Sequence, residues 1–394
     1  MGSHVILDLS ALVATADRPI PRGIPRVELA YAKHLLRTYP DRLRFSAFWG
    51  RLGYVPFDSG LALVAAAERQ WSDADSEAAA EARRIVSRLR RGILLRGDAA
   101  LYRELGSNGV YVIVSHPLLG RMRTMQQIRR RIGARFFCLV HDLIGIDNPD
   151  YVRPRQRRRH PRRMDSVAGF ADVIAANSAA TAEAFRRRYD GRDFGGRVVA
   201  APLGVDVSGA VPAPPARNDS YFVCVAAIEP RKNHELLFRV WRRLGEDAPR
   251  RILVGERGWQ AGRILRNRPP SFVEEYSGLP DTAVAQLLRG AHALVYPSLA
   301  EGFGLPVAEA LALGVPVLCS DLPELWEVGK TGPEYLDPHD AQAWLDAVRD
   351  YADPLSSRRQ AQLRRIAGWR APTWEDHFAI VQPLLDRLAA IPSP

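Results

Sequence analysis

Residues 293–310 have the sequence ALVYPSLAEGFGLPVAEA, which joins an apolar segment, a glycine loop and the start of a helix. Ala293–Tyr296 is continuously apolar, as is typical of a strand in a parallel sheet that is covered on both faces. Two glycines then flank Phe303, and Leu305-Pro306 opens a helix, because proline is tolerated in the first helical turn. The free backbone N–H groups at such a helix start favour a phosphate group. The stretch therefore predicts a doubly wound α/β domain with a phosphate-binding loop.

Strands and helices alternate on both sides of this stretch. In the C-terminal half, we expect strands at 221–227, 251–255, 293–296 and 316–320, and helices at 234–244, 281–289, 305–313 and 341–352. In the N-terminal half, we expect strands at 5–9, 44–48, 110–114, 136–140, 173–176 and 198–201, and helices at 27–39, 122–132 and 179–189. The pattern predicts two Rossmann-like domains that face a central cleft at the carboxyl ends of their strands.

A proline-rich stretch near the middle of the chain marks the expected domain boundary. At 394 residues, the chain is longer than a single hydrophobic core usually supports. The alternation breaks at 208–219, so we expect one domain at 1–208 and a second at 217–372. Residues 61–105 are rich in alanine, arginine and glutamate, and they predict a helical insertion in the first domain.

The composition is that of a globular protein, with 47% hydrophobic and 25% charged residues. The sequence contains no stretch of about 18 consecutive apolar residues, the length that a membrane-spanning helix requires. Cys138, Cys224 and Cys319 each lie in an apolar segment, which favours reduced thiols in a core over disulfides or a metal site. We therefore expect a cytoplasmic protein.

Most of the positive charge is concentrated in one segment. The net charge is +11, and Arg153–Arg163 holds seven arginines and no acid, so the rest of the chain sums to +4 (11 minus 7). Such a segment can bind nucleic acid, an anionic membrane surface or a phosphorylated substrate, or it can be a solvated loop without a partner.

Two groups of charged residues follow predicted strands in the C-terminal half. Glu301 lies in the glycine loop, and Glu309 lies inside the helix that follows, so the two carboxylates can address different parts of one ligand. Arg231 and Lys232 come after the strand expected at 221–227. Adjacent cations at the carboxyl end of a strand can neutralise a diphosphate leaving group while a bond to it breaks.

The whole constellation resembles glycosyltransferase family 4, whose members are retaining enzymes of the GT-B fold. Glu301 and Glu309 match the two glutamates of the family signature, and the residues between them, including Gly302–Pro306, also match. The resemblance implies that Glu301 hydrogen-bonds hydroxyls of the donor sugar and that Glu309 holds the nucleotide ribose. It further implies donor contacts from the loop itself, namely Gly302, Phe303, Gly304 and Leu305.

The cation pair and parts of the N-terminal half share the resemblance. Arg231 and Lys232 match the family residues that stabilise the leaving diphosphate, although Ala226-Ala227 stands where a glycine is usual. The Arg22–Arg26 loop resembles a glycine-arginine loop, with Pro25 where glycine is more common. By this match, Gly23 faces the donor phosphates and Arg26 lies on the acceptor side.

His141-Asp142-Leu143 also resembles a family motif at the end of a strand. It implies that His141 reaches the transferred sugar and that Asp142 helps to form the acceptor side. Residues 373–394 resemble the closing segment, a helix that crosses back to complete the N-terminal domain.

The resemblance implies transfer of a sugar from a nucleoside diphosphate to a hydroxyl with the anomeric configuration kept. We expect no cofactor and no metal ion, because Arg231 and Lys232 supply the positive charge and no paired-aspartate motif is present. The pattern is most similar to bacterial polysaccharide mannosyltransferases, which suggests GDP-mannose as the donor. We expect a glycan or polyprenyl-diphosphate-linked acceptor, and Arg153–Arg163 at an anionic surface on the inner face of the cytoplasmic membrane.

Two other functions remain open from the sequence. A sugar-nucleotide epimerase can share the fold and would convert its donor without an acceptor. A nucleic-acid-binding protein could use Arg153–Arg163, but that segment lacks interleaved aromatic residues, and this function leaves Glu301 and Glu309 unexplained. We therefore do not expect nucleic acid as a partner.

Overall fold

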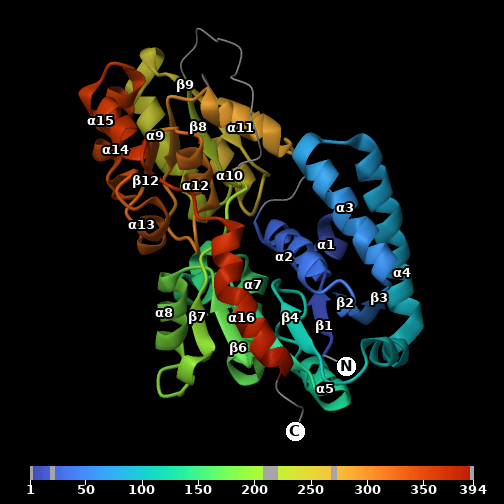
Figure 1. The fold of residues 1–394 in the computed structure, drawn as a ribbon. Coiled ribbons are helices and arrows are strands. Elements are labelled where there is room, and N and C mark those ends of the chain that lie inside the picture. The colour runs from blue at the N-terminus through green and yellow to red at the C-terminus, as the bar shows by residue number, and fades with distance from the viewer. Residues whose placement is uncertain (1–2, 18–22, 207–220, 268–272, 391–394) are drawn as a thin grey trace. The chain divides into compact units, whose positions relative to one another are not determined.

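The computed structural model describes residues 3–17, 23–206, 221–267 and 273–390, and the chain divides into two compact units (Figure 1). The first unit comprises Met1–Ile146, Pro154–Leu203 and Trp374–Pro394. The second comprises Asp147–Arg153 and Gly204–Thr373. The linker expected at 208–219 and residue Arg22 of the glycine-arginine loop lie outside the described residues.

The first unit is built on a seven-stranded sheet with the order β3-β2-β1-β4-β5-β6-β7. The strands are β1 (Val5–Asp8), β2 (Leu43–Trp49), β3 (Arg51–Val55), β4 (Val110–Ile113), β5 (Arg135–Val140), β6 (Val173–Ala176) and β7 (Val198–Ala200). Every neighbouring pair is parallel except β2 and β3, which form an antiparallel hairpin at the edge. The sequence did not predict β3.

Helices surround this sheet. They are α1 (Ser10–Thr15), α2 (Ile24–Thr38), α3 (Phe57–Asp73), α4 (Ser76–Leu105), α5 (Met122–Ile132), α6 (Ile144–Asp147), α7 (Pro154–Phe170), α8 (Ala179–Arg188) and α16 (Trp374–Ala390), with a short 3₁₀ turn at Gly195–Arg197. The 3₁₀ turn at Pro149–Tyr151 belongs to the second unit. The residues expected as a helical insertion form the hairpin of α3 and α4, which stands beside β3 and β2 (Figure 1).

The last helix, α16, packs on the first unit. The buried His377 ring places Nδ1 3.0 Å from the carbonyl oxygen of Pro202, and its Nε2 lies 2.8 Å from the hydroxyl of Tyr31. Tyr39 donates a hydrogen bond of 2.6 Å to Asp386. Because α16 also buries Phe378, its contacts close the core of a unit that begins near the other end of the chain.

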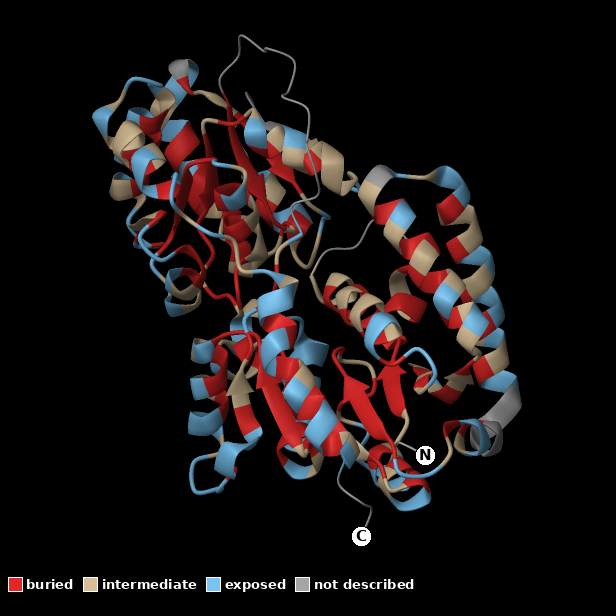
Figure 2. Cartoon of the chain, in the orientation of Figure 1, coloured by how far each residue is buried: buried red, intermediate tan, exposed pale blue. Residues whose placement is uncertain are grey.

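The second unit has a six-stranded sheet, entirely parallel, with the order β10-β9-β8-β11-β12-β13. The strands are β8 (Tyr221–Val225), β9 (Arg250–Val254), β10 (Val273–Tyr276), β11 (Ala293–Tyr296), β12 (Val317–Ser320) and β13 (Glu334–Leu336). The helices are α9 (His234–Leu244), α10 (Ala261–Arg266), α11 (Asp281–Arg289), α12 (Leu305–Ala312), α13 (Pro323–Gly329), α14 (Ala341–Ala352) and α15 (Ser357–Ile366), with 3₁₀ turns at Pro230–Lys232 and Gly245–Asp247. The central strands of both sheets are buried (Figure 2), as their apolar segments predict.

Candidate active site

The candidate site lies where the neighbouring strands β8 and β11 of the second unit end. These strands are parallel, so their carboxyl ends meet at one edge of the sheet. The turn Pro230–Lys232 follows β8 and carries both cations, and the loop with Glu301 follows β11. The amide of Leu299 donates a 2.8 Å hydrogen bond to the carbonyl oxygen of Arg231, which ties the two loops together.

Glu301 brings Arg231 and Lys232 together in one ion cluster. Its Oε1 lies 2.5 Å from Nζ of Lys232, and its Oε2 lies 3.0 Å from Nη1 of Arg231. Arg231 also donates 2.9 Å from Nη2 to Oε1 of Glu229 and 3.0 Å from Nη1 to the carbonyl oxygen of Ala300. The side chains of Lys232 and Glu301 are only 9% and 7% exposed, so this pair is held away from water.

Tyr296, the last residue of β11, completes the support of Lys232. The lysine Nζ donates a 2.6 Å hydrogen bond to the phenol oxygen and lies 4.7 Å from the centre of the ring. Neither Tyr296 nor Glu229 was predicted from the sequence. The signal for Tyr296 was its position, as the aromatic residue that ends the strand immediately before the glycine loop.

Burial and charge oppose each other in this cluster. Burial alone would raise the pKa of Glu301, but Lys232 and Arg231 lower it to about 2. Burial lowers the pKa of Lys232, the charge of Arg231 lowers it further, and Glu301 opposes both effects. Burial raises the pKa of Tyr296 well above its ordinary value, so its phenol stays neutral. The result is a fixed pair of cations whose charge is compensated by the carboxylates of Glu229 and Glu301.

The glycine loop turns into α12 at Gly304. This residue has φ +100°, a region that favours glycine, and a Cβ added there would lie 2.4 Å from Cδ2 of Leu325. Phe303 is buried, and Leu305 is the first helical residue. Glu309 is half-buried one turn further along α12, about 6 Å up the axis from Leu305. Gly302, also half-buried, lies between Glu301 and Phe303.

In the first unit, His141 and Asp142 follow β5. The buried His141 donates from Nε2 to the carbonyl oxygen of Val114 at 2.8 Å. Burial lowers its pKa, so the ring is neutral at neutral pH. The carboxylate of Asp142 accepts the amide of Ile144 at 3.0 Å, and its carbonyl oxygen lies 3.1 Å from Nε2 of His160. The histidine and the aspartate are therefore both fixed by their own unit.

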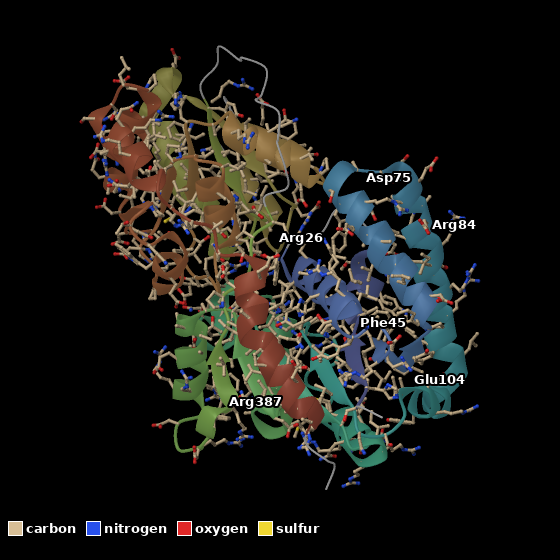
Figure 3. All side chains as sticks on the ribbon, viewed as in Figure 1. Arg26, Phe45, Asp75, Arg84, Glu104 and Arg387 are labelled. Carbon is tan, nitrogen blue, oxygen red and sulfur yellow. The ribbon has the colours of Figure 1, made fainter. Side chains whose placement is uncertain are left out.

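Gly23 and Arg26 lie at the start of α2. Gly23 is the residue before the helix and has φ +76°. The guanidinium of Arg26 lies 5.6 Å from the centre of the Trp71 ring on α3. Arg26 is labelled in Figure 3. The structure therefore places these two residues together in the first unit. Arg231, Lys232, Glu301 and Glu309 belong to the second.

Two buried carboxylates near this loop were not predicted. Glu28 on α2 accepts the amides of Leu12 at 2.7 Å and Ala11 at 3.1 Å, and so caps the start of α1. Burial, together with the nearby Asp8, raises the pKa of Glu28 to about 8. Burial raises the pKa of Asp8 to about 6. A glutamate on the apolar side of an expected helix was the available signal.

The arginine segment forms a helix. The loop conformation that the sequence left open for Arg153–Arg163 is wrong, because all but Arg153 of these residues belong to α7. The exposed arginines are Arg153, Arg155, Arg157, Arg158, Arg159 and Arg162. The helical pattern instead points the buried His160 and Met164 into the first unit.

The described residues contain no group of three or more histidine, cysteine, aspartate or glutamate side chains that could hold a metal ion. In the same part of the chain, no helix combines the length and the apolar character needed to cross a membrane. The three cysteines are buried and free.

The second unit, which carries this site, is similar to known glycosyltransferases. Residues 219–353 match the family model described as Glycosyl transferases group 1. The chain carries a glycosyltransferase domain. O-antigen chain mannosyltransferase B of Escherichia coli is 27% identical over 262 residues, which are 61% of this chain and 68% of that protein. O-antigen chain mannosyltransferase RfbU of Salmonella typhimurium is 33% identical over 144 residues, or 34% of this chain and 38% of that protein.

These matches identify the chain as a transferase that resembles glycosyltransferase family 4. Serotype-specific mannosyltransferase WbdA of Escherichia coli is 26% identical over 258 residues, and the aligned part spans about a third of that protein (32%). The expected resemblance and the expectation of an enzyme are confirmed.

Solved structures show the fold of this glycosyltransferase. Sucrose-phosphate synthase from Thermosynechococcus elongatus has a TM-score of 0.64 at 15% identity, with 99% of this chain and 100% of that chain covered. Anabaena Alr3699/HepE in complex with UDP-glucose has a TM-score of 0.65 at 15% identity, with 98% and 100% covered. The GT-B fold, with two α/β units on parallel sheets, is therefore confirmed.

Proposed function

We propose that this chain is a retaining glycosyltransferase that transfers mannose from GDP-mannose to a hydroxyl of a glycan or lipid-linked glycan in bacterial surface polysaccharide synthesis. The ion cluster of Arg231, Lys232 and Glu301 carries the proposal, because it places a buried lysine and a half-buried arginine beside the glycine loop. The choice of mannose is supported by two of the relatives, which are O-antigen mannosyltransferases.

In this proposal the donor occupies the second unit. Its diphosphate lies beside Arg231 and Lys232, and the start of α12 offers backbone N–H groups at Gly304 and Leu305. Glu309 holds the ribose and Glu301 the hydroxyls of the sugar. Because Glu301 already pairs with both cations, the same carboxylate sets the position of the sugar and of the diphosphate relative to each other.

The reaction exchanges one bond for another at the anomeric carbon. The bond from that carbon to the diphosphate oxygen breaks, and the acceptor hydroxyl oxygen forms the new bond on the same face. The leaving diphosphate takes the hydroxyl proton, so no enzyme nucleophile is needed. Arg231 and Lys232 stabilise the negative charge that grows on the leaving group. We propose that their charge makes a metal ion unnecessary, and transfer should persist in EDTA.

The first unit supplies the acceptor side. His141 reaches the transferred sugar, Gly23 faces the phosphates, and Arg26 and Asp142 border the acceptor. The exposed arginines of Arg153–Arg163 suit a polyprenyl-diphosphate-linked acceptor or an anionic membrane on the inner face of the cytoplasmic membrane. Charge reversal of Arg157, Arg158 and Arg159 should weaken vesicle flotation, and identical flotation of both forms would refute this part.

A panel of sugar nucleotides tests the donor. Wild type should bind one of these sugar nucleotides and hydrolyse it slowly. Lys232→Ala and Glu309→Ala should bind it more weakly and hydrolyse it more slowly than wild type does. Arg239→Ala, a change to an exposed residue on the adjoining helix α9, is the matched control. If no nucleotide binds, the proposal is wrong. If a donor is converted to an epimer without acceptor, the chain is an epimerase.

A further inference from the structure

The long helix α4 has two opposite faces. Ala82, Val86, Leu89 and Ile93 are buried, and their spacing of three or four residues places them on one side. The opposite side is exposed and consists of Arg83, Arg84, Ser87, Arg88, Arg91, Leu94 and Leu95. Figure 3 shows Arg84 on the side of the helix that faces away from the strands.

The exposed side is basic and, at one end, apolar. Residues 82–97 contain no aspartate or glutamate. Arg84 and Arg91 donate only to Ala80 and Ser87 of their own helix, among the contacts of the described residues. The side chain that turns inward, Arg90, instead pairs with Asp17 and lies 4.2 Å from the centre of the Trp49 ring.

Two leucines stand out at the end of this face. Leu95 is 83% exposed and Leu94 is 52% exposed, which are high values for large apolar side chains in a helix whose other leucines and isoleucines are better covered. Arg84 and Leu95 are eleven positions apart, so the face runs about 16 Å along the helix. Arginines beside exposed leucines are the combination that binds at the headgroup boundary of a bilayer.

We propose that this face of α4, defined by Arg84, Arg88, Arg91, Leu94 and Leu95, binds an anionic membrane surface. The arginines meet lipid phosphates while the leucines enter the boundary between headgroups and acyl chains. It is a separate surface from the arginines of α7. The inference does not rest on the proposed function, because vesicle binding is measured without donor or acceptor.

Other occupants fit this face less well. A second copy of the chain, docked about a two-fold axis, would set the arginines of one α4 against those of the other, and like charges would repel. Nucleic acid would use the arginines but would leave Leu94 and Leu95 without a role. An anionic bilayer uses both kinds of side chain at once.

The test is co-sedimentation of the full chain with vesicles of phosphatidylcholine, alone or with an equal amount of phosphatidylglycerol. Wild type should bind the mixed vesicles and not the neutral ones. Arg84→Glu/Arg88→Glu/Arg91→Glu should weaken binding by at least about tenfold, since each arginine near the surface contributes to the attraction. Leu94→Ala/Leu95→Ala should weaken binding that persists at high salt, where screening removes the electrostatic part.

The matched control alters the net charge by the same amount but at other positions. Arg349→Glu/Arg364→Glu/Arg387→Glu alters three exposed arginines on α14, α15 and α16. Its binding should stay within about twofold of wild type, because these arginines do not lie on the proposed face. Equal loss in both triple variants would overturn the proposal, as would unchanged binding in both α4 variants. A wild-type dimer that Leu94→Ala/Leu95→Ala converts to monomer, without an effect on vesicles, would assign the face to a second copy instead.

Discussion

Nζ of Lys232 lies 2.5 Å from Oε1 of Glu301, although the two residues are 69 positions apart in the chain. The contact joins the loops after two neighbouring parallel strands, so the sheet itself holds the ammonium and the carboxylate in place. The ammonium of Lys232 is therefore held away from water, and the partly exposed guanidinium of Arg231 is fixed by three hydrogen bonds. Under the proposed function, little reorganisation is needed when negative charge develops beside these cations.

Removal of the carboxylate should damage both stability and transfer. Glu301→Gln keeps the volume but leaves Lys232 buried without its carboxylate, and we expect the free energy of unfolding to fall by about 3 kcal/mol. Transfer, measured as kcat/KM, should fall at least about 100-fold. Urea unfolding and a donor-turnover assay measure the two effects, with the exposed Glu246→Gln as control.

The same variant has a distinct pH signature. The pKa of Glu301 is lowered to about 2 in the folded chain, so its contribution is present above the ordinary value near 4.5 and is lost as the pH falls towards 2. The stability difference between wild type and Glu301→Gln should narrow over that window. A difference that stays constant from pH 5 to pH 3 would contradict the assignment.

Tyr296→Phe tests the support of Lys232. The variant keeps the ring but loses the hydroxyl that accepts the 2.6 Å hydrogen bond from the ammonium. Because a hydrogen bond to a charged group contributes about 1.5 kcal/mol or more, kcat/KM should fall about tenfold. The alkaline limb of the pH–rate profile should move to lower pH, because the ammonium form of Lys232 loses a partner. Tyr221→Phe, whose hydroxyl bonds to Leu287, should leave that limb unmoved.

Gly304→Ala should lower the free energy of unfolding more than a substitution at a glycine where only the positive φ is unfavourable. At Gly304 the new methyl meets both a φ of +100° and Cδ2 of Leu325 at 2.4 Å. Gly314 has φ +71° with no atom within 4 Å of the added Cβ, so Gly314→Ala measures backbone strain alone, of order 1–2 kcal/mol. Chemical unfolding should show a larger loss for Gly304→Ala, and Leu325→Val should recover part of that excess. Equal losses at the two glycines would show that the leucine contact has no effect.

His377 should make the first unit less stable in mild acid. Burial lowers its pKa to about 4, while the unfolded chain titrates near 6.5, so the unfolded state binds the extra proton first. The contribution is present above pH 6.5 and is lost, by up to about 3 kcal/mol, as the pH falls towards 4. His377→Gln should reduce this dependence of stability on pH without abolishing it, because burial also lowers the pKa values of His116 and His141 in the same unit. Replacement of the exposed His339 should leave this dependence unchanged.

The central strands could be predicted because they consist almost entirely of apolar residues, as in Val5–Leu7 of β1 and Ala293–Tyr296. Of the edge strands, only β7 was predicted, at 198–201. Val273–Tyr276 carries two glutamates, Glu334–Leu336 has only three residues, and Arg51–Val55 depends on a hairpin partner. Edge strands are shorter and partly solvated, so their composition resembles that of loops.

The sequence also predicted which residues gather at the ends of β8 and β11, but not how they pair. The resemblance gave Glu301 a role towards the sugar, whereas the structure shows it bound to Arg231 and Lys232. Such pairing depends on the distance between side chains of two different loops, which no local pattern encodes. The contact of Tyr296 with Lys232 was not predicted for a related reason. A tyrosine in a buried strand is more often part of the core.

Synthesis on the ribosome follows a different order from the finished architecture. Strands β1 to β7 are synthesised first. The contacts of Tyr31 and Pro202 with His377 can form only later, because His377 is made after residues 204–373. At ordinary translation rates that interval is roughly ten to thirty seconds. During it, the nascent first unit has an open apolar strip where Phe378 and its neighbours will dock. The chain therefore passes through a stage at which this part of the first unit is exposed, and the stage ends only when α16 has been made.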